Sequence, residues 1–513
     1  MKRIIATLIA CCIFLASMPI LSATAVDADP AVAQAVGTQD DGVPFILIRG
    51  VDFGALYTDY GTPEQAPAVP PITAGGIASA LFKAVGSGIR HLSVDRAVKE
   101  IFDYAVGIMG NLACDEDGNP VYDLGLNRFP LSAGNYENQL ITGGGWGVEE
   151  GIVKSAAERY GADSTYYFTY DWRLNPLDIC DEINDMVNRA LAEHNTTKVN
   201  LVCASMGGLE AVAYLSKYGY DKVNRCVFLS STFYGVYIAS DLFCGRMTVT
   251  EPSLYNFLID KTQDNRALNI TVNLLYKTGV IKLASSFANG FIGRYKGMVY
   301  SEYLQDVIAT MPVFWGLVQP EDYSQALHTM FGGQEEEYAG IIAISRQLQA
   351  MMKGRDDLLK EATANGVQFA VVANYNRPAM PIYEKAGANS DGGLETALVS
   401  GGATVAGFGK TLGSDYVPAD PGYISPDNVI DASTCLFPDF TWFVKDGEHV
   451  ACSYGTEYSD FLFWIVDCEG QPTVAGNPRY PQFMVSGNGQ TLAGLTALPA
   501  KPKPAPVLSQ KHR

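Results

Sequence analysis

The sequence is short of positive charge. It carries 36 Lys and Arg residues against 55 Asp and Glu residues, a formal net charge of −19. Proteins that hold a nucleic-acid backbone do so with Lys and Arg contacts that release counterions, so this balance has the wrong sign and excludes nucleic acid as an expected partner. The composition is otherwise that of a globular protein, 48% hydrophobic and 18% charged, and 513 residues suffice to bury a large core.

Long apolar runs are absent outside the N-terminus. Residues 4–21 form an almost uncharged apolar stretch after two basic residues, and the small residues 23–25 offer a cleavage site. This layout predicts a secretory signal peptide over residues 1–25, a flexible leader over residues 26–42 and a secreted or extracytoplasmic protein. An uncleaved membrane anchor is the alternative for the apolar stretch. No later stretch reaches the roughly 18 apolar residues that a spanning helix needs.

Closely spaced cysteine pairs of the CxxC type are also absent, which argues against a zinc or redox site of that kind. Ten cysteines are present, two of them inside the predicted signal peptide. The even number that remains permits disulfides in an exported chain, but their connectivity cannot be deduced. Cys203 and Cys226 lie within apolar runs, and we expect both to be buried thiols.

Short apolar runs recur along the chain and alternate with helical patterns. The runs are 44–48, 166–169, 199–203, 226–229, 369–373 and 441–444, and the helical patterns before three of them are 148–159, 177–193 and 207–218. This alternation predicts an α/β fold with a mostly parallel sheet flanked by helices. We place the folded domain at residues 43–497, followed by a disordered, basic, Pro-rich tail over residues 498–513.

Two mostly helical insertions interrupt the alternation, at about residues 52–140 and 240–365. Insertions of this kind commonly form lids and substrate pockets. In the first insertion, residues 77–109 carry apolar positions at helical spacing between Pro-rich and Gly-containing joints. Two interpretations remain open for this segment: a mobile lid that meets lipid aggregates, or an ordinary cap packed on the sheet.

The stretch 199–208 has the pattern of a nucleophile elbow, in which a strand turns sharply into a helix and lifts a serine above the sheet edge. Ser205 is the candidate nucleophile, and Gly207 supplies the small residue that crowding demands on its far side. Cys203 stands where the GxSxG motif has glycine, and it is small enough to fit. The elbow is typical of the α/β-hydrolase fold, with the insertions as helical caps.

Histidine is scarce, which makes the choice of a general base unusually direct. In the α/β-hydrolase chain order the histidine follows the nucleophile and the acid, so His91 and His194 are excluded. His512 lies in the tail, and His328 lies in the helical insertion. His449 remains, a few residues after an apolar run, and we predict that it is the base.

The acid should lie between the serine and the histidine, in a loop after a later strand. Asp391 sits in the sequence Asn-Ser-Asp-Gly-Gly, whose glycines permit a tight turn, and it is our first choice. The reserve candidates are Glu395, Asp427, Asp431 and Asp439. The oxyanion would be bound by the backbone amides of Met206 and of Val51, with Asp52 as the alternative for the second donor.

The segment Tyr170 to Pro176, YDWRLNP, carries a family resemblance. Together with the serine motif it resembles the lecithin:cholesterol acyltransferase and lysosomal phospholipase A2 family. Further segments similar to that family occur in its order at 46–51, 143–147, 230–235, 390–393 and 446–449. The resemblance implies a lipid ester as substrate, and it gives no reason to expect a metal or another cofactor.

Within that segment, Tyr170, Asp171, Trp172 and Arg173 are predicted to support the active site. We expect Arg173 to pair with a buried carboxylate beneath the site, with direct substrate contact as the alternative. The sequence thus predicts an exported serine acyl-ester hydrolase or O-acyltransferase that makes transient contact with a membrane surface. A small-ester or peptide hydrolase and a non-catalytic cell-surface binding protein are the alternatives, and the oligomeric state is left open.

Overall fold

The structure is a computed structural model. It describes residues 42–52, 54–70, 107–136, 148–452, 455–487 and 489–496. The predicted signal peptide, nearly all of the leader, most of the segment 77–109, the segment 143–147 and the C-terminal tail lie outside the described residues.

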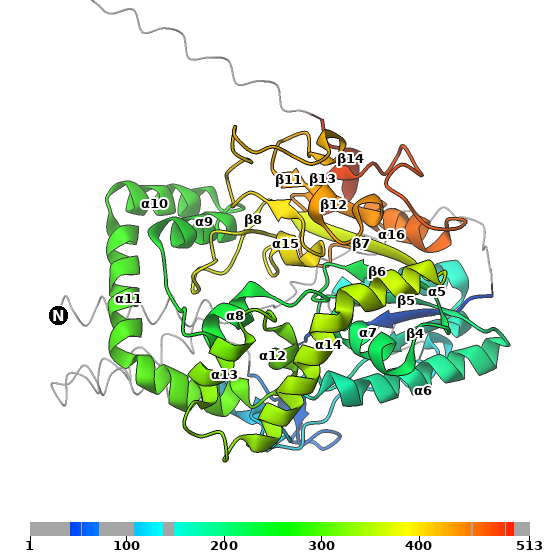
Figure 1. The fold of residues 1–513 in the computed structure, drawn as a ribbon, viewed down its shortest axis with the longest axis horizontal. Helices are drawn as coiled ribbons and strands as arrows, with labels where there is room; N and C mark the ends of the chain where they lie inside the picture. The colour runs from blue at the N-terminus through cyan, green and yellow to red at the C-terminus, as the bar shows by residue number, and fades with distance from the viewer. Residues whose placement is uncertain are drawn as a thin grey trace, which may run out of the picture.

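An eight-stranded sheet forms the centre of the fold (Figure 1). Its strands are β1 (Phe45–Ile48), β4 (Thr165–Phe168), β5 (Val199–Ala204), β6 (Val223–Leu229), β7 (Gln368–Tyr375), β12 (Thr441–Lys445), β13 (Phe483–Gly487) and β14 (Thr491–Gly494). They lie in the order β14-β13-β12-β7-β6-β5-β1-β4. Every neighbouring pair is parallel except β13 and β14. The predicted mostly parallel sheet is confirmed.

The apolar runs became strands because both faces of the sheet are covered. In β1, Ile46 and Ile48 pack into a core on one face, and Phe45 and Leu47 pack into a second core on the other. All four side chains are fully buried. A strand with two buried faces reads as a continuous apolar run rather than as an alternation, which is the pattern of these segments.

Helices cover the two faces of the sheet. One face carries α6 (Pro176–His194), α7 (Gly207–Tyr218) and α14 (Ala339–Ala364); the other carries α5 (Val148–Tyr160) and α16 (Glu457–Asp467). Local signals start and stop α6: the Asn175 side chain accepts a hydrogen bond from the Leu177 amide, Pro176 takes the first turn, and Asn195 ends the helix with φ of 50°.

The chain between β6 and α14 is helical and lies beside the sheet, toward the left of Figure 1. It contains α8 (Tyr237–Phe243), α9 (Glu251–Lys261), α10 (Arg266–Lys277), α11 (Val280–Met298), the π-helical segment η4 (Val299–Ala309), α12 (Pro312–Leu317) and α13 (Tyr323–Phe331). These helices occupy the stretch where the sequence predicts the second insertion.

Shorter elements complete the described residues. Two-stranded ribbons pair β2 (Tyr57–Thr58) with β3 (Ala66–Pro67), β8 (Arg377–Pro378) with β9 (Asn389–Ser390), and β10 (Thr404–Val405) with β11 (Ile430–Asp431). The short helices are η1 (Gly110–Leu112), η2 (Ala133–Tyr136), η3 (Ala162–Ser164), α15 (Thr396–Val399), η5 (Pro421–Tyr423), η6 (Ala432–Thr434) and η7 (Pro438–Phe440). The ribbon of β8 and β9 matters most here, because it leads directly into Asp391.

The eight cysteines of the described residues are free thiols. Cys203 and Cys226 lie on neighbouring strands with their Sγ atoms 3.9 Å apart, and both are fully buried, as predicted. Among the helices that the structure describes, none combines the length and the apolar character that crossing a bilayer requires.

Candidate active site

Ser205 occupies the sharp turn between β5 and α7. Its φ is 49°, a left-handed conformation that a serine rarely adopts. Both backbone polar groups of Ser205 are hydrogen-bonded. The Ser205 amide donates to the Leu229 carbonyl at 3.1 Å, and the Ser205 carbonyl accepts from the Thr232 amide at 2.9 Å. The surrounding hydrogen bonds therefore maintain the strained backbone that presents the Ser205 hydroxyl.

Gly207 shows why the turn needs a small residue. A Cβ atom at this position would lie 2.4 Å from the carbonyl oxygen of Ile48 and 2.9 Å from that of Arg49. Both are backbone atoms at the end of β1, so they cannot move aside as a flexible side chain would. The elbow consequently packs directly against the loop that follows β1, where Val51 lies.

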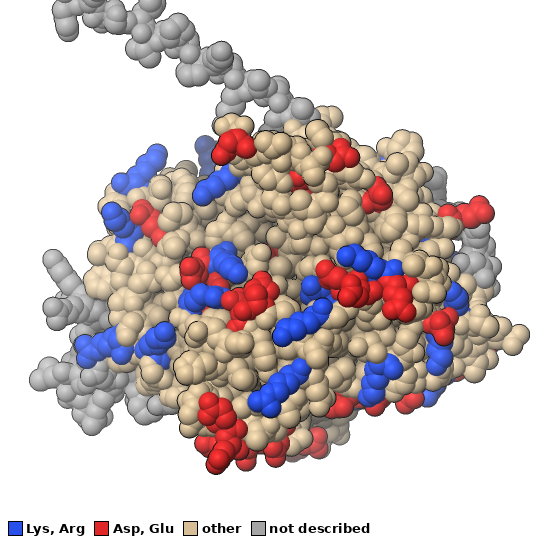
Figure 2. All heavy atoms as spheres, in the orientation of Figure 1, with Lys and Arg blue, Asp and Glu red and all other residues tan. Residues whose placement is uncertain are grey.

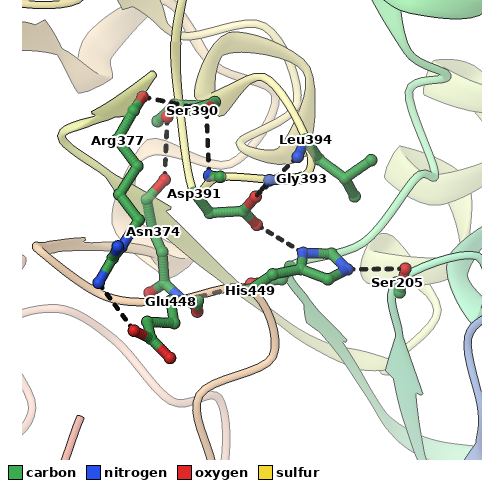
Figure 3. A network of polar contacts seen from close by, with 12 residues as sticks. Ser205, Asn374, Arg377, Ser390, Asp391, Gly393, Leu394, Glu448 and His449 are labelled. Atoms are coloured by element: carbon green, nitrogen blue, oxygen red, sulfur yellow. Dashed lines mark hydrogen bonds and ion pairs between the residues drawn. The ribbon is translucent and has the colours of Figure 1, made fainter. Parts of the chain in front are cut away.

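His449 lies in the loop after β12 and reaches back over the serine (Figure 3). Its Nε2 is 2.9 Å from the Ser205 Oγ. The loop is shaped by left-handed residues on both sides of the histidine, Asp446 with φ of 59° and Val450 with φ of 53°. It is also tied to β7, because the Asn374 side-chain amide donates to the Glu448 carbonyl at 2.6 Å.

Asp391 completes a hydrogen-bonded chain with the histidine and the serine. Its Oδ2 is 2.8 Å from His449 Nδ1, and its Oδ1 accepts the amides of Gly393 at 2.8 Å and Leu394 at 2.7 Å. The carboxylate is fully buried, whereas the imidazole keeps 15% of its exposure. The three side chains thus run from a buried acid to a partly exposed serine.

The four reserve candidates for the catalytic acid all form hydrogen bonds with residues other than His449. Glu395 accepts from the Tyr383 hydroxyl and the Tyr237 amide, and burial raises the pKa of this carboxyl. The other three pair elsewhere in the same way: Asp427 with Tyr375, Ser425 and Lys445; Asp431 with Ser433 and Tyr416; and Asp439 with Tyr423. Of the five carboxylates considered from sequence, the structure brings Asp391 to His449.

Two backbone amides near Ser205 remain available to a ligand. Met206 is the residue before α7, so its amide lies at the N-terminus of that helix, where partial positive charge accumulates. Within the part of the chain that the structure describes, neither the Met206 amide nor the Val51 amide has a hydrogen-bond acceptor. Both therefore fit the role of donors to an anionic oxygen.

The segment 170–173 holds the loop after β1 through two hydrogen bonds. The Tyr170 hydroxyl donates to the Arg49 carbonyl at 3.1 Å, and the Trp172 indole nitrogen donates to the Asp52 carbonyl at 3.3 Å. These two bonds lie on either side of Val51. The segment consequently fixes the backbone whose amide is a candidate oxyanion donor.

Arg173 pairs with its near neighbour Asp171. The two side chains form a buried ion pair at 2.7 Å, and the guanidinium also donates to the carbonyls of Asn111 and Tyr122. Arg173 thereby ties the end of β4 to the chain before α5. This arrangement is structural support rather than an exposed cation for a substrate.

Arg377 is a residue of the site that sequence reasoning missed. It forms ion pairs with Asp260 on α9 at 3.2 Å and with Glu448 at 2.9 Å. Its backbone pairs with Ser390, the residue before the acid (Figure 3). Burial raises the pKa of the Asp260 carboxyl, while Arg377 lowers it. One signal existed in the sequence, an arginine just after a predicted strand, but nothing local connects it to residue 260 or 448.

No group of three or more His, Cys, Asp and Glu side chains in the described ranges is arranged to hold a metal ion. The arrangement instead offers a serine, a base and an acid in one hydrogen-bonded line. Such a line suits nucleophilic attack on an ester carbonyl.

Comparison with known proteins agrees with the fold. A family model described as the alpha/beta hydrolase fold matches residues 156–256, which include β4, β5, α7 and Ser205. No curated protein and no solved structure matches. The match and the mostly parallel eight-stranded sheet flanked by helices show that this chain has the α/β-hydrolase fold, which supports hydrolase activity in general.

Proposed function

We propose that the protein is an exported serine acyl-ester hydrolase or O-acyltransferase that acts on a lipid ester through an acyl-enzyme on Ser205. The observation that carries the proposal is the line of hydrogen bonds from Asp391 through His449 to Ser205. Export rests on the N-terminal sequence pattern alone.

In this proposal His449 Nε2 takes the proton of the Ser205 hydroxyl as Oγ attacks the ester carbonyl. The amides of Met206 and Val51 stabilise the oxyanion of the tetrahedral intermediate. The C–O bond then breaks, and the protonated imidazole returns its proton to the leaving alcohol. Asp391 holds the Nδ1–H tautomer throughout, since it is fixed by two backbone amides of its own loop.

The second half of the reaction frees the serine. His449 deprotonates water or an acceptor alcohol, which attacks the carbonyl of the acyl-enzyme. The bond between the acyl carbon and Ser205 Oγ then breaks, the imidazolium returns its proton to Oγ, and an acid or a new ester leaves. Hydrolysis and transfer share every residue named above and differ in how well water is excluded.

The lipid substrate is supported by the family resemblance of residues 170–176 and by apolar residues next to the site. Val51 and Leu394 are apolar and half-buried, and each lies in a loop that contributes to the proposed machinery. A small-ester or peptide hydrolase of the same fold is the competing enzyme function. A non-catalytic binding protein on the same scaffold is the competing function of another class.

Labelling with a fluorophosphonate probe tests the chemistry. The full chain should form an adduct at Ser205, and the Ser205→Ala variant should form none. Ser231→Ala is the matched control, because Ser231 is a buried serine close to the elbow and should leave labelling intact. An adduct at another serine would overturn the assignment.

A substrate series separates the candidate functions. Turnover should rise along p-nitrophenyl esters of increasing chain length and should extend to phosphatidylcholine. A preference for acetate without phospholipid turnover would favour the small-ester hydrolase, and a folded protein that turns over no ester would favour the binding protein. Adding an acceptor alcohol then distinguishes transfer, which forms a new ester, from hydrolysis.

A further inference from the structure

Exposed apolar side chains are concentrated on α10 and α11. Of the fourteen large apolar side chains that stand exposed among the described residues, eight lie between positions 268 and 287. They are Leu268, Ile270, Leu274, Leu275, Tyr276, Val280, Leu283 and Phe287. We call these eight side chains the α10–α11 apolar surface. Clusters of this kind mark interaction sites, whereas single exposed apolar residues are ordinary.

These side chains are exposed because only a few residues of each helix pack against the rest of the protein. Val272 is the buried residue of α10, although the helix has apolar residues around most of its circumference, and Ile270 and Leu274 are each 59% exposed. In α11, Val280, Leu283 and Phe287 are spaced i, i+3 and i+7 and share a face. A helix with so much apolar surface would normally be buried, so this surface lacks a covering layer among the described residues.

The charge of this region has the opposite sign to that of the protein. Between residues 265 and 300 there are five basic residues and no acidic residue, in a chain of net charge −19. The five are Arg266, Lys277, Lys282, Arg294 and Lys296, and all are exposed. Figure 2 shows this edge, at the left, as mainly tan with blue groups and little red.

We propose that α10 and α11 dock the protein on the surface of an anionic lipid bilayer. The α10–α11 apolar surface would enter the boundary between headgroups and acyl chains, while the lysines and arginines contact anionic headgroups. The proposal deepens the proposed function, because it places a lipid-ester enzyme on a lipid surface. The docking itself requires no catalysis, so it is tested separately.

Contacts of α9 connect α10 to the loop that carries His449. Tyr255 of α9 stacks on Tyr276 of α10 with ring centroids 4.1 Å apart, and its hydroxyl donates to Asn273 at 2.8 Å. At the end of α9, Asp260 pairs with Arg377, which pairs with the residue before His449. A continuous set of contacts therefore runs from the apolar surface to the histidine loop.

Vesicle flotation tests the docking, with every variant made in the full chain carrying Ser205→Ala so that no ester is cleaved. The protein should float with vesicles of equal parts phosphatidylcholine and phosphatidylglycerol, and much less with phosphatidylcholine alone. Reversing two charges in Lys277→Glu/Lys282→Glu should weaken binding at least about tenfold. Removing apolar contact in Leu274→Ser/Leu283→Ser should also reduce it at least about tenfold.

Matched controls distinguish binding through α10 and α11 from nonspecific binding to vesicles. Lys353→Glu/Lys360→Glu reverses two exposed lysines of α14, and Val417→Ser removes the most exposed apolar side chain of the described residues. Both should bind vesicles as the parent does, and circular dichroism should show that all variants are folded. Equal binding by the α10–α11 variants and their parent would overturn the proposal.

Two other outcomes would also contradict it. Binding that is independent of anionic lipid would remove the role of the basic residues. A dimer in sedimentation that Leu274→Ser/Leu283→Ser dissociates would make the α10–α11 apolar surface an interface between two copies instead. If docking holds while the wild-type chain cleaves no ester, the proposed function fails and the docking proposal stands.

Discussion

Arg377 pairs with Glu448, the residue immediately before the proposed catalytic histidine, at 2.9 Å. The same guanidinium pairs with Asp260 at the end of α9. The two acids differ in environment, because 13% of the Asp260 side chain is exposed but 65% of the Glu448 side chain. The arginine thus joins a helix of the cap to the loop that carries His449, with one mostly buried and one exposed partner.

Removing Arg377 should destabilise the protein far more than removing Glu448. Arg377→Met leaves Asp260 nearly buried without its cation, at a cost of about 1–3 kcal/mol, whereas Glu448→Gln breaks an exposed pair that contributes about 0–1 kcal/mol. Since burial already raises the pKa of Asp260, the stability of Arg377→Met should fall further as pH rises above the acidic range. Urea unfolding at several pH values measures both effects.

A double variant checks the cause. Asp260→Asn combined with Arg377→Met leaves no unpaired charge and should recover most of the lost free energy of unfolding and its pH dependence. If the double variant is as unstable as Arg377→Met, the buried charge is not the reason.

Tyr170 should affect catalysis through the position of the loop after β1. Tyr170→Phe removes the hydroxyl that holds the Arg49 carbonyl and should lower kcat about tenfold with little change in KM, because the Val51 amide would act in the transition state. Tyr323→Phe is the matched control, since its hydroxyl bonds Ser345 between α13 and α14. Both variants should lose about 1 kcal/mol of stability. Equal kcat values for the two would exclude a special role for Tyr170.

Gly208 should tolerate a side chain only when Ser231 is replaced by a smaller residue. A Cβ atom at Gly208 would lie 1.6 Å from the Ser231 Oγ, so Gly208→Ala should cost about 1–3 kcal/mol and reduce probe labelling. Adding Ser231→Gly should restore much of both. Gly207→Ala, which meets backbone atoms, should not be rescued by the same change. Thermal melting and labelling of the set provide the comparison.

Glu210 should make the protein less stable as pH rises. This carboxyl of α7 is fully buried, neither of its oxygens has a hydrogen-bond partner among the described residues, and burial raises its pKa well above 4.5. The native state therefore keeps a proton that the unfolded state releases. Stability contributed by this group falls above the unfolded pKa, at most about 1.4 kcal/mol per pH unit.

Glu210→Gln should flatten that dependence while preserving shape, and Glu210→Leu should also raise the melting temperature by removing the buried polar group. Melting curves from mildly acidic to mildly alkaline pH measure the slope. An unchanged slope in Glu210→Gln would show that another group titrates.

The sequence predicted the central strands well for a physical reason: strands buried on both faces are continuous apolar runs, as in β1, β5 and β7. It did not predict β13, whose apolar run is only three residues long, or β14, the edge strand, most of whose residues are exposed. The chain order of the fold, with the places of the other histidines, selected His449. For the acid it defined only the stretch between the serine and the histidine, and the glycines after Asp391 made that residue the first choice. The structure brings both together with Ser205.

Two features could not be predicted from the sequence: the ion pairs of Arg377, and the lack of packing on the apolar face of α10 and α11. Arg377 is separated from Asp260 by 117 residues and from Glu448 by 71, so no local pattern links them. For α10 and α11, helical spacing shows which apolar residues share a face but not whether anything packs on that face. The three-dimensional arrangement was needed to find both features.

The hydrogen bonds of Figure 3 also bear on how the chain folds. His449 lies 58 residues from Asp391 and 244 residues from Ser205, and the three belong to loops after different strands. Contacts of such long range require most of the sheet to be assembled before they form. Probe labelling at Ser205 during refolding should therefore lag behind the recovery of helical circular dichroism, which makes the serine a built-in reporter of the last tertiary step.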